Sequence, residues 1–193
     1  TIPDIEGMTV KGIVSSDGKG DEGVVVSDGY EVTTTDAKGI YYLPSKKKNK
    51  YVFISVPGNY EVVNEKNLPI FFQRLAGGTT VEQKDFSLIE VDNNKHVVLT
   101  MADWHLANRS NTSDIAQFKN SVLPDINATM PEYKAEGTKV YGLTLGDMSW
   151  ETFWYNTKFA LPEYLQEMYK VNTTIFNVMG NHDNDPYAKT DWD

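Results

Sequence analysis

Hydrophobic and polar residues alternate with a period of two along much of the N-terminal half of the chain. Alternating or β-branched runs of this kind predict strands, and they occur at 9–16, 23–27, 30–35, 40–43, 51–56 and 81–89. Turn-forming pairs such as Asp17-Gly18 and Asp28-Gly29 separate the runs. Short strands joined by such turns are typical of an antiparallel β-sandwich, which we predict for residues 1–91.

A polar stretch at 92–95 ends this pattern, and longer apolar runs follow it. Three of these runs predict buried strands, at 96–101, 140–145 and 174–179, and we expect the first strand to be buried on both faces. After the first run, apolar residues recur at helical spacing: Ile115, Phe118, Val122 and Ile126. We expect Pro124 to kink or restart this helix, and a second helix to run from Pro162 to Val171. The alternation predicts an α/β layered domain over 92–193, and therefore a two-domain α+β chain.

The composition excludes several kinds of protein. The chain has 27 acidic and 18 basic residues, with a formal net charge of −9. Binding to a nucleic-acid backbone is not expected, because it needs clustered Lys and Arg. The lysine-rich run at 46–50 is expected to be a solvated turn. No apolar run approaches the roughly 18 residues of a transmembrane segment, and the absence of cysteine excludes disulfides and thiolate metal ligands.

Polar clusters follow each of the three predicted buried strands. The clusters are Asp103-Trp104-His105, Gly146-Asp147 and Gly180-Asn181-His182-Asp183. Ligands at the carboxyl ends of neighbouring strands are what a site in an open α/β layer requires. Carboxylate, amide and imidazole ligands suit Mn²⁺, Fe or Zn²⁺. The clusters therefore predict one metal site at this edge of the sheet.

These three clusters, in this order, closely resemble the pattern of the calcineurin-like metallophosphoesterases over residues 96–185. The resemblance implies four ligands for two divalent ions: Asp103, His105, Asp147 and Asn181. It implies that Asp147 bridges the two ions and that His182 is the catalytic residue that assists the leaving group. The implied activity is hydrolysis of a small phosphate mono- or diester by a hydroxide that bridges the metals.

Two further groups of residues have open interpretations. Many members of the family carry a second acid three residues after the bridging aspartate, where it orients the catalytic histidine. Trp150 occupies that position here, so Glu151 or Asp183 could take the orienting role. Three tryptophans could form an aromatic wall for the substrate or pack beneath a loop: Trp104, Trp150 and Trp154. His96, at the start of a strand, is expected to be structural.

The N-terminal region resembles a second family, the carboxypeptidase-regulatory-like or transthyretin-like module, over roughly residues 7–63. The resemblance rests on residues such as Gly12, Gly23, Asp36, Gly39 and Tyr60. Such modules usually lack catalysis and are commonly appended to exported proteins. The resemblance therefore implies an extracytoplasmic location, either periplasmic or at the cell surface or secreted.

In the phosphoesterase family the three clusters are followed by a single His and then by a Gly-His-x-His motif. This chain has only three histidines in all, and neither of these later motifs is present. We therefore expect residues 92–193 to be the N-terminal half of a phosphoesterase domain. Full activity is expected to need a missing C-terminal half, so that the chain alone is inactive. The alternative hypothesis is a non-catalytic cell-surface binding or adhesion module with a degenerate phosphoesterase-like domain.

Overall fold

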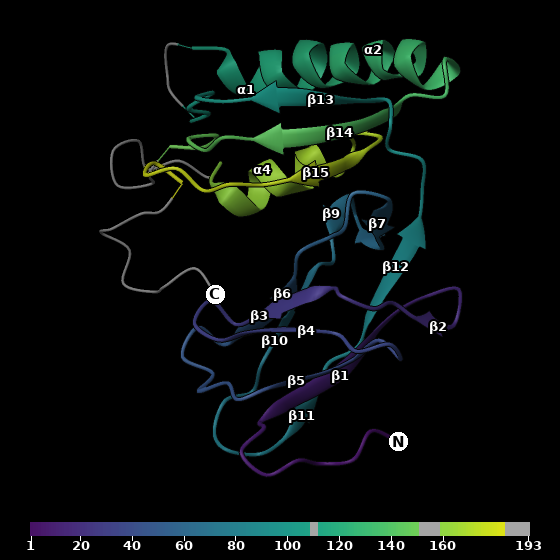
Figure 1. Ribbon diagram of the computed structural model, residues 1–193. Helices are drawn as coiled ribbons and strands as arrows, with labels where there is room; N and C mark the ends of the chain where they lie inside the picture. Colours follow the sequence, from purple (N-terminus) through teal and green to yellow (C-terminus); the bar gives the residue numbers. More distant parts are fainter. Residues whose placement is uncertain (109–111, 151–158, 184–193) are drawn as a thin grey trace. The chain divides into compact units, whose positions relative to one another are not determined.

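A computed structural model describes most of the chain, namely residues 1–108, 112–150 and 159–183. The described residues are rich in strands and contain few helices (Figure 1). The chain divides into two compact units: unit 1, which comprises Thr1–Glu65 and Pro69–Asn93, and unit 2, which comprises Lys66–Leu68 and Asn94–Asp193.

The first 90 residues form short strands. They are β1 (Val10–Ser16), β2 (Lys19–Gly20), β3 (Val25–Ser27), β4 (Val32–Thr34), β5 (Ile40–Leu43), β6 (Tyr51–Ile54), β7 (Tyr60–Val62), β8 (Asn64–Glu65), β9 (Leu68–Pro69), β10 (Phe72–Arg74), β11 (Glu82–Gln83) and β12 (Phe86–Glu90). One sheet has the order β11-β1-β12-β7, with β2 and β5 also paired to β1, and a second has the order β10-β6-β3-β4. Strands from both sheets contribute to one apolar core, which includes Val10, Val14, Val26, Leu43, Val52 and Phe86. Unit 1 is therefore β-sandwich-like, as the alternation predicts.

The prediction of a purely antiparallel sandwich is wrong at β1. This strand runs parallel to both β11 and β12, and the single strand predicted at 81–89 is divided into these two. At the division, the Asp85 carboxylate accepts a hydrogen bond from the backbone N–H of Ile13 (2.9 Å), in place of a strand carbonyl. Gly12 lies opposite the break, where an added Cβ would stand 1.9 Å from the Lys84 carbonyl oxygen. The alternation of apolar residues predicts a strand here. It does not reveal that a carboxylate takes the place of a backbone carbonyl as the hydrogen-bond acceptor.

The lysine-rich run at 46–50 is a mostly exposed turn, as predicted, except at Lys47. Lys47 is 4% exposed, and its Nζ lies 2.7 Å from a Glu82 carboxylate oxygen and 2.6 Å from the Thr80 carbonyl oxygen. Burial raises the pKa of Glu82, but hydrogen bonds from Lys47 and from the Ala76 N–H outweigh it, so that this pKa lies below its usual value. Lys47 is therefore a buried ion-pair partner, because the strand-like alternation of 45–47 directs it inward.

A second buried charge, Asp28, orders the turn between β3 and β4. Its carboxylate accepts hydrogen bonds from the Ser45 hydroxyl and from the backbone N–H groups of Tyr30 and Glu31. Burial raises the pKa of Asp28, but these hydrogen bonds to the ionised form outweigh it, and the pKa lies below its usual value. Asp28 thus stabilises the folded unit as a carboxylate.

Unit 2 contains a parallel sheet with the order β13-β14-β15. Its elements are β13 (His96–Met101), α1 (Asp114–Gln117), the π-helical turn η1 (Phe118–Val122), α2 (Leu123–Ala135), β14 (Lys139–Thr144), α4 (Leu161–Met168) and β15 (Thr174–Phe176). Pro124 lies in the first turn of α2, directly after the π-helical turn. Because proline has no N–H to donate, a helix restarts readily at this position, as predicted.

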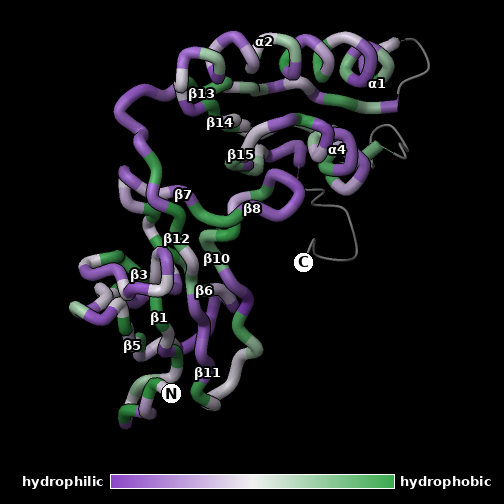
Figure 2. Tube along the Cα trace, turned by 90° about the vertical axis from the view of Figure 1, so that its right-hand side faces the viewer, coloured by the Kyte–Doolittle hydropathy of each residue, from purple (hydrophilic) through white to green (hydrophobic). Residues whose placement is uncertain are grey.

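The helices of unit 2 pack on one face of this sheet. Figure 2 shows α1 and α2 beside β13 and α4 beside β15. Phe118 of η1 stacks on Tyr164 of α4 at a ring distance of 6.0 Å. The core joins these rings to strand residues including Val140 and Ile175. The other face is only partly covered, since Val98 is 45% exposed. The prediction that 96–101 is buried on both faces is therefore wrong: β13 is an edge strand with helices on one face. None of the described helices has the length and hydrophobicity of a membrane span.

Candidate functional site

Three loops meet at the carboxyl ends of β13, β14 and β15. Between the first two loops the parallel pairing continues past the strands, because the N–H groups of Asp103 and His105 donate to the carbonyls of Gly146 and Asp147 at 3.1 and 2.9 Å. A further bridge pairs Leu106 with Ser149. Backbone hydrogen bonds therefore hold the two loops to each other beyond the ends of the strands.

The backbone of the first two loops is strained at three of the predicted ligands. Asp103, His105 and Asp147 have positive φ angles of 57°, 48° and 55°. Within the described residues from Asn94 onward, they are the three non-glycine residues with a positive φ. Such a conformation costs on the order of 1–3 kcal/mol for each residue and is retained mainly where the surroundings impose it. The strain thus coincides with the residues that the sequence motifs select.

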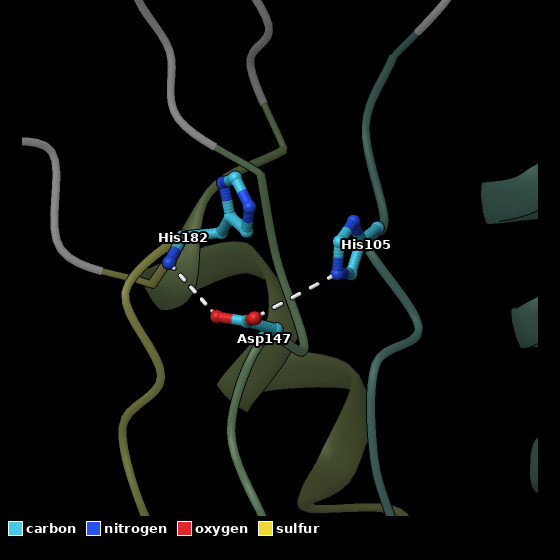
Figure 3. A group of neighbouring side chains, drawn as sticks. All are labelled: His105, Asp147 and His182. Carbon is cyan, nitrogen blue, oxygen red and sulfur yellow. Dashed lines mark hydrogen bonds and ion pairs between the residues drawn. The ribbon is translucent and has the colours of Figure 1, made fainter.

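Three side chains converge in this region, as Figure 3 shows: those of His105, Asp147 and His182. One ligand atom from each lies within 4.8 Å of the other two. Asp147 is fixed between the histidines, because one of its oxygens accepts a hydrogen bond from the His182 backbone N–H (2.8 Å) and the other lies 3.8 Å from His105 Nε2. All three side chains are partly buried. The structure therefore brings together a carboxylate and two imidazoles from three separate loops.

The two other predicted ligands lie at the edge of this group. An Asp103 carboxylate oxygen is 3.8 Å from His105 Nε2, and the Asp103 side chain is 71% exposed. Asn181 is exposed in the third loop, between Gly180 and His182. The role of both residues as ligands stays a prediction.

Two glycines let the second and third loops approach closely. A Cβ at Gly146, which has a φ of 94°, would lie 2.5 Å from the Gly180 nitrogen. A Cβ at Gly180 would lie 2.1 Å from an Asp147 carboxylate oxygen. These distances are far shorter than van der Waals contact, so the position of Asp147 depends on glycine at both places.

A second carboxylate, Asp183, ties the same two loops in the opposite direction. It is 4% exposed, and one oxygen accepts hydrogen bonds from the Ser149 N–H (2.8 Å) and hydroxyl (3.1 Å). The other oxygen accepts from the Gly180 N–H at 2.9 Å. Asp147 thus reaches from the second loop to the third, and Asp183 reaches back. In these contacts Asp183 orients the two loops. Its predicted role is to orient the imidazole of the catalytic histidine.

Ser149 and Tyr164 belong to this environment, although the sequence motifs do not indicate them. Tyr164 is 1% exposed, and its hydroxyl has no hydrogen-bond partner among the described residues. Burial, and then the negative charge of Asp183, raises the pKa of Tyr164 well above its usual value. A serine in a loop and a tyrosine on a helix are too common in sequences to be recognised without the fold.

The tryptophans separate into two environments. Trp150 stacks on His182 at a ring distance of 4.3 Å and an interplanar angle of 18°, and it also contacts His105 at 4.4 Å. Trp104 packs against Phe118 of the core at 5.1 Å, which agrees with the packing interpretation for that residue. Trp154 and Glu151 lie outside the described residues. His96 is at the start of β13, at the opposite end of that strand from the loops.

The donor set fits a divalent metal ion. Imidazole nitrogens and a carboxylate oxygen, without thiolates, are ligands for Mn²⁺, Fe and Zn²⁺. His105 and Asp147 are poised to hold such an ion, with His182 beside them. The two imidazole rings lie beside each other next to the carboxylate, with their centroids 4.8 Å apart (Figure 3).

Comparison with known proteins adds one finding. No curated protein and no solved structure matches the chain. Residues 8–91, which form most of unit 1, match a family model described as the N terminal of calcineurin-like phosphoesterase. The match covers the sandwich-like region and does not include the loops of the candidate site, and it does not test the resemblance to a carboxypeptidase-regulatory-like module. Unit 1 is thus of a kind found at the N terminus of calcineurin-like phosphoesterases.

Proposed function

We propose that the chain belongs to a metal-dependent phosphoesterase whose site lies at the carboxyl ends of β13, β14 and β15. The observation that carries this proposal is the convergence of His105, Asp147 and His182 to within 4.8 Å. The match of residues 8–91 to an N-terminal phosphoesterase region supports it independently, because that match does not involve these residues. The substrate class is a small phosphate mono- or diester.

The proposed roles follow from the geometry and from the sequence resemblance. His105 and Asp147 would hold a divalent ion, with Asp103 and Asn181 as further ligands at the exposed edge. A bound divalent ion supplies Lewis-acid polarisation of a phosphoryl oxygen and lowers the pKa of water. Asp147 keeps its orientation through the His182 N–H, which leaves its second oxygen toward His105.

His182 would donate a proton to the leaving oxygen or form a hydrogen bond to it. Its imidazole is partly buried and is held against the Trp150 ring. Stacking restricts the rotation of the imidazole, so Trp150 supplies part of the orientation for which the sequence pattern expects an acid. A general acid that is held in one orientation loses less entropy in the transition state.

Substitution of Asp147 tests this function. We expect Mn²⁺ affinity, measured by isothermal titration calorimetry, to fall in Asp147→Asn by more than the roughly 10–100-fold that loss of an outer-shell partner costs. The exposed Asp125→Asn variant removes the same charge in α2 and should bind Mn²⁺ like the parent. Equal Mn²⁺ affinity in the parent and in Asp147→Asn would overturn the site.

Hydrolysis is the second measurement, with an aryl phosphate and an aryl phosphodiester as substrates. We expect any turnover to require Mn²⁺ and to disappear in Asp147→Asn. Mn²⁺ binding without turnover in every form of the protein that contains this chain would favour the alternative, a non-catalytic binding module.

The extracytoplasmic location also stays a proposal that rests on the resemblance of the N-terminal region to modules of exported proteins.

A further inference from the structure

Two pairs of consecutive residues from the second and third loops lie side by side in the candidate site. They are Ser149-Trp150 and His182-Asp183. Ser149 contacts Asp183 through two hydrogen bonds, in which its N–H and its hydroxyl donate to one carboxylate oxygen at 2.8 and 3.1 Å. Trp150 contacts His182 by ring stacking at 4.3 Å. Each pair therefore supplies one residue to a hydrogen-bonded contact and its neighbour to an aromatic contact.

The hydrogen-bonded contact is buried, whereas the aromatic contact belongs to the candidate site. Ser149 and Asp183 are 2% and 4% exposed, so water does not compete for their hydrogen bonds. The His182 side chain is only partly buried, and its ring lies 4.8 Å from that of His105. The buried contact is therefore the more firmly held of the two, and it lies one residue away from the aromatic contact in each loop.

The backbone on both sides of the His182 imidazole is fixed by carboxylates. The second oxygen of Asp183 accepts a hydrogen bond from the Gly180 N–H at 2.9 Å, so both oxygens are bound and the carboxylate is held in one orientation. The His182 N–H donates to Asp147 at 2.8 Å. Because these bonds fix the backbone and not the side-chain torsions, the orientation of the imidazole depends on what its ring packs against.

We infer that Ser149 is a positioning residue for His182, because its hydrogen bonds to Asp183 hold Trp150 at the separation at which the indole stacks on the imidazole. The inference rests on the proposed function, in which His182 assists the leaving oxygen. An indole has no carboxylate with which to hold an imidazole, so stacking orients the imidazole only while the two rings keep a fixed separation. A fixed separation needs a rigid connection between the two loops, and the Ser149–Asp183 contact is such a connection.

NMR spectra of the imidazole groups test this inference, because the chain has only three histidines. A ring that stacks on an indole is shielded by it, so the His182 signals should lie upfield of those of His96, at the opposite end of β13. Trp150→Leu should abolish this upfield shift, which identifies its origin. Ser149→Ala removes the hydroxyl hydrogen bond to Asp183 but keeps the N–H hydrogen bond, so it should reduce the shift while the chain stays folded.

Ser121→Ala is the matched control, because Ser121 is an exposed serine of the same unit, in η1. It should give the parent spectrum, and urea unfolding of each variant shows whether the fold is retained. The inference is wrong if Ser149→Ala leaves the His182 signals unchanged. It is also wrong if Ser149→Ala moves the His96 signals as much as those of His182, because the loss of a merely structural contact would then explain the result.

Kinetics supply a second readout in any form of the protein that hydrolyses an aryl phosphate. Ser149→Ala should lower kcat by roughly tenfold and leave KM unchanged, because the imidazole acts on the leaving oxygen and not on substrate binding. A raised KM with an unchanged kcat would contradict the inference. The imidazole spectra are recorded on the metal-free chain and do not depend on turnover. Absence of Mn²⁺ binding would therefore overturn the proposed function, whereas an unchanged His182 signal in Ser149→Ala would overturn the positioning role alone.

Discussion

The two units use close backbone approaches for different purposes. In unit 1, Gly12 lets β1 approach the Lys84 carbonyl, and the result is a closed ladder around a core. In unit 2, Gly180 lets a loop approach the Asp147 carboxylate, and the result is a site. The same contrast holds for backbone strain, which falls on turn residues such as Asp17 and Lys50 in unit 1, but on Asp103, His105 and Asp147 in the described part of unit 2 from Asn94 onward.

Residues with a positive φ therefore serve different purposes in the two units. Turn residues with positive φ close hairpins and gain strand pairing in return. Asp103, His105 and Asp147 lie beyond the strand ends, where backbone pairing continues but the strand conformation has ended. Strain in such a position is more readily explained by the arrangement of side chains than by the fold itself.

The largest expected effect separates the two glycines. Gly12→Ala should lower the free energy of unfolding by about 3 kcal/mol, because its Cβ would meet a backbone oxygen that the strand pairing holds in place. Gly180→Ala should mainly displace Asp147 and abolish Mn²⁺ binding, with a smaller loss of stability. Urea unfolding and calorimetry on both variants check this. A variant pair in which Gly12→Ala impaired Mn²⁺ binding more than Gly180→Ala would remove the contrast.

An intermediate effect is expected at the buried carboxylate of unit 1. Asp28→Asn should lose about 1–2 kcal/mol at pH 7, since the Ser45 hydroxyl and two N–H groups bind the ionised form. The pKa of Asp28 is lower in the folded state, so its stabilisation is present above its unfolded pKa of about 4 and is lost as the pH falls through the folded value. Urea unfolding at several pH values should show the difference from the parent narrowing below about pH 4. Exposed Asp125→Asn is the control, and a difference that grew in acid would contradict this account.

The smallest effect compares two fully buried tyrosines. Tyr41 in unit 1 donates its hydroxyl to the Lys84 carbonyl, whereas the Tyr164 hydroxyl in unit 2 has no described partner. Tyr41→Phe should therefore destabilise the chain by roughly 1 kcal/mol, and Tyr164→Phe should be neutral or slightly stabilising. Thermal and urea unfolding of both variants measures this. A clear loss of stability in Tyr164→Phe would show that its hydroxyl is bound in the folded protein.

Local sequence was sufficient for the elements and for much of the candidate site. The alternation of apolar residues predicts most of the strands of unit 1, and the position of Pro124 predicts where the helix restarts. His105, Asp147 and His182 can be selected from the sequence because each lies in a polar motif that directly follows an apolar run. The three motifs are Asp-x-His, Gly-Asp and Gly-Asn-His. Ser149 and Tyr164 cannot be selected in this way, since Ser149 matters through its hydrogen bonds to Asp183 and Tyr164 through the charge of Asp183, and Asp183 is distant from both in the sequence.

The sequence by itself determined where strands form and which polar residues follow them, because both depend on local periodicity and on the chemistry of neighbouring residues. Only the tertiary structure decided that β1 runs parallel to β12, that Lys47 is buried, and that one face of β13 stays open. It also decided that Asp147 and Asp183 cross between the same two loops. These features depend on residues that are distant in sequence, and a one-residue difference in pairing would change them without changing any local pattern.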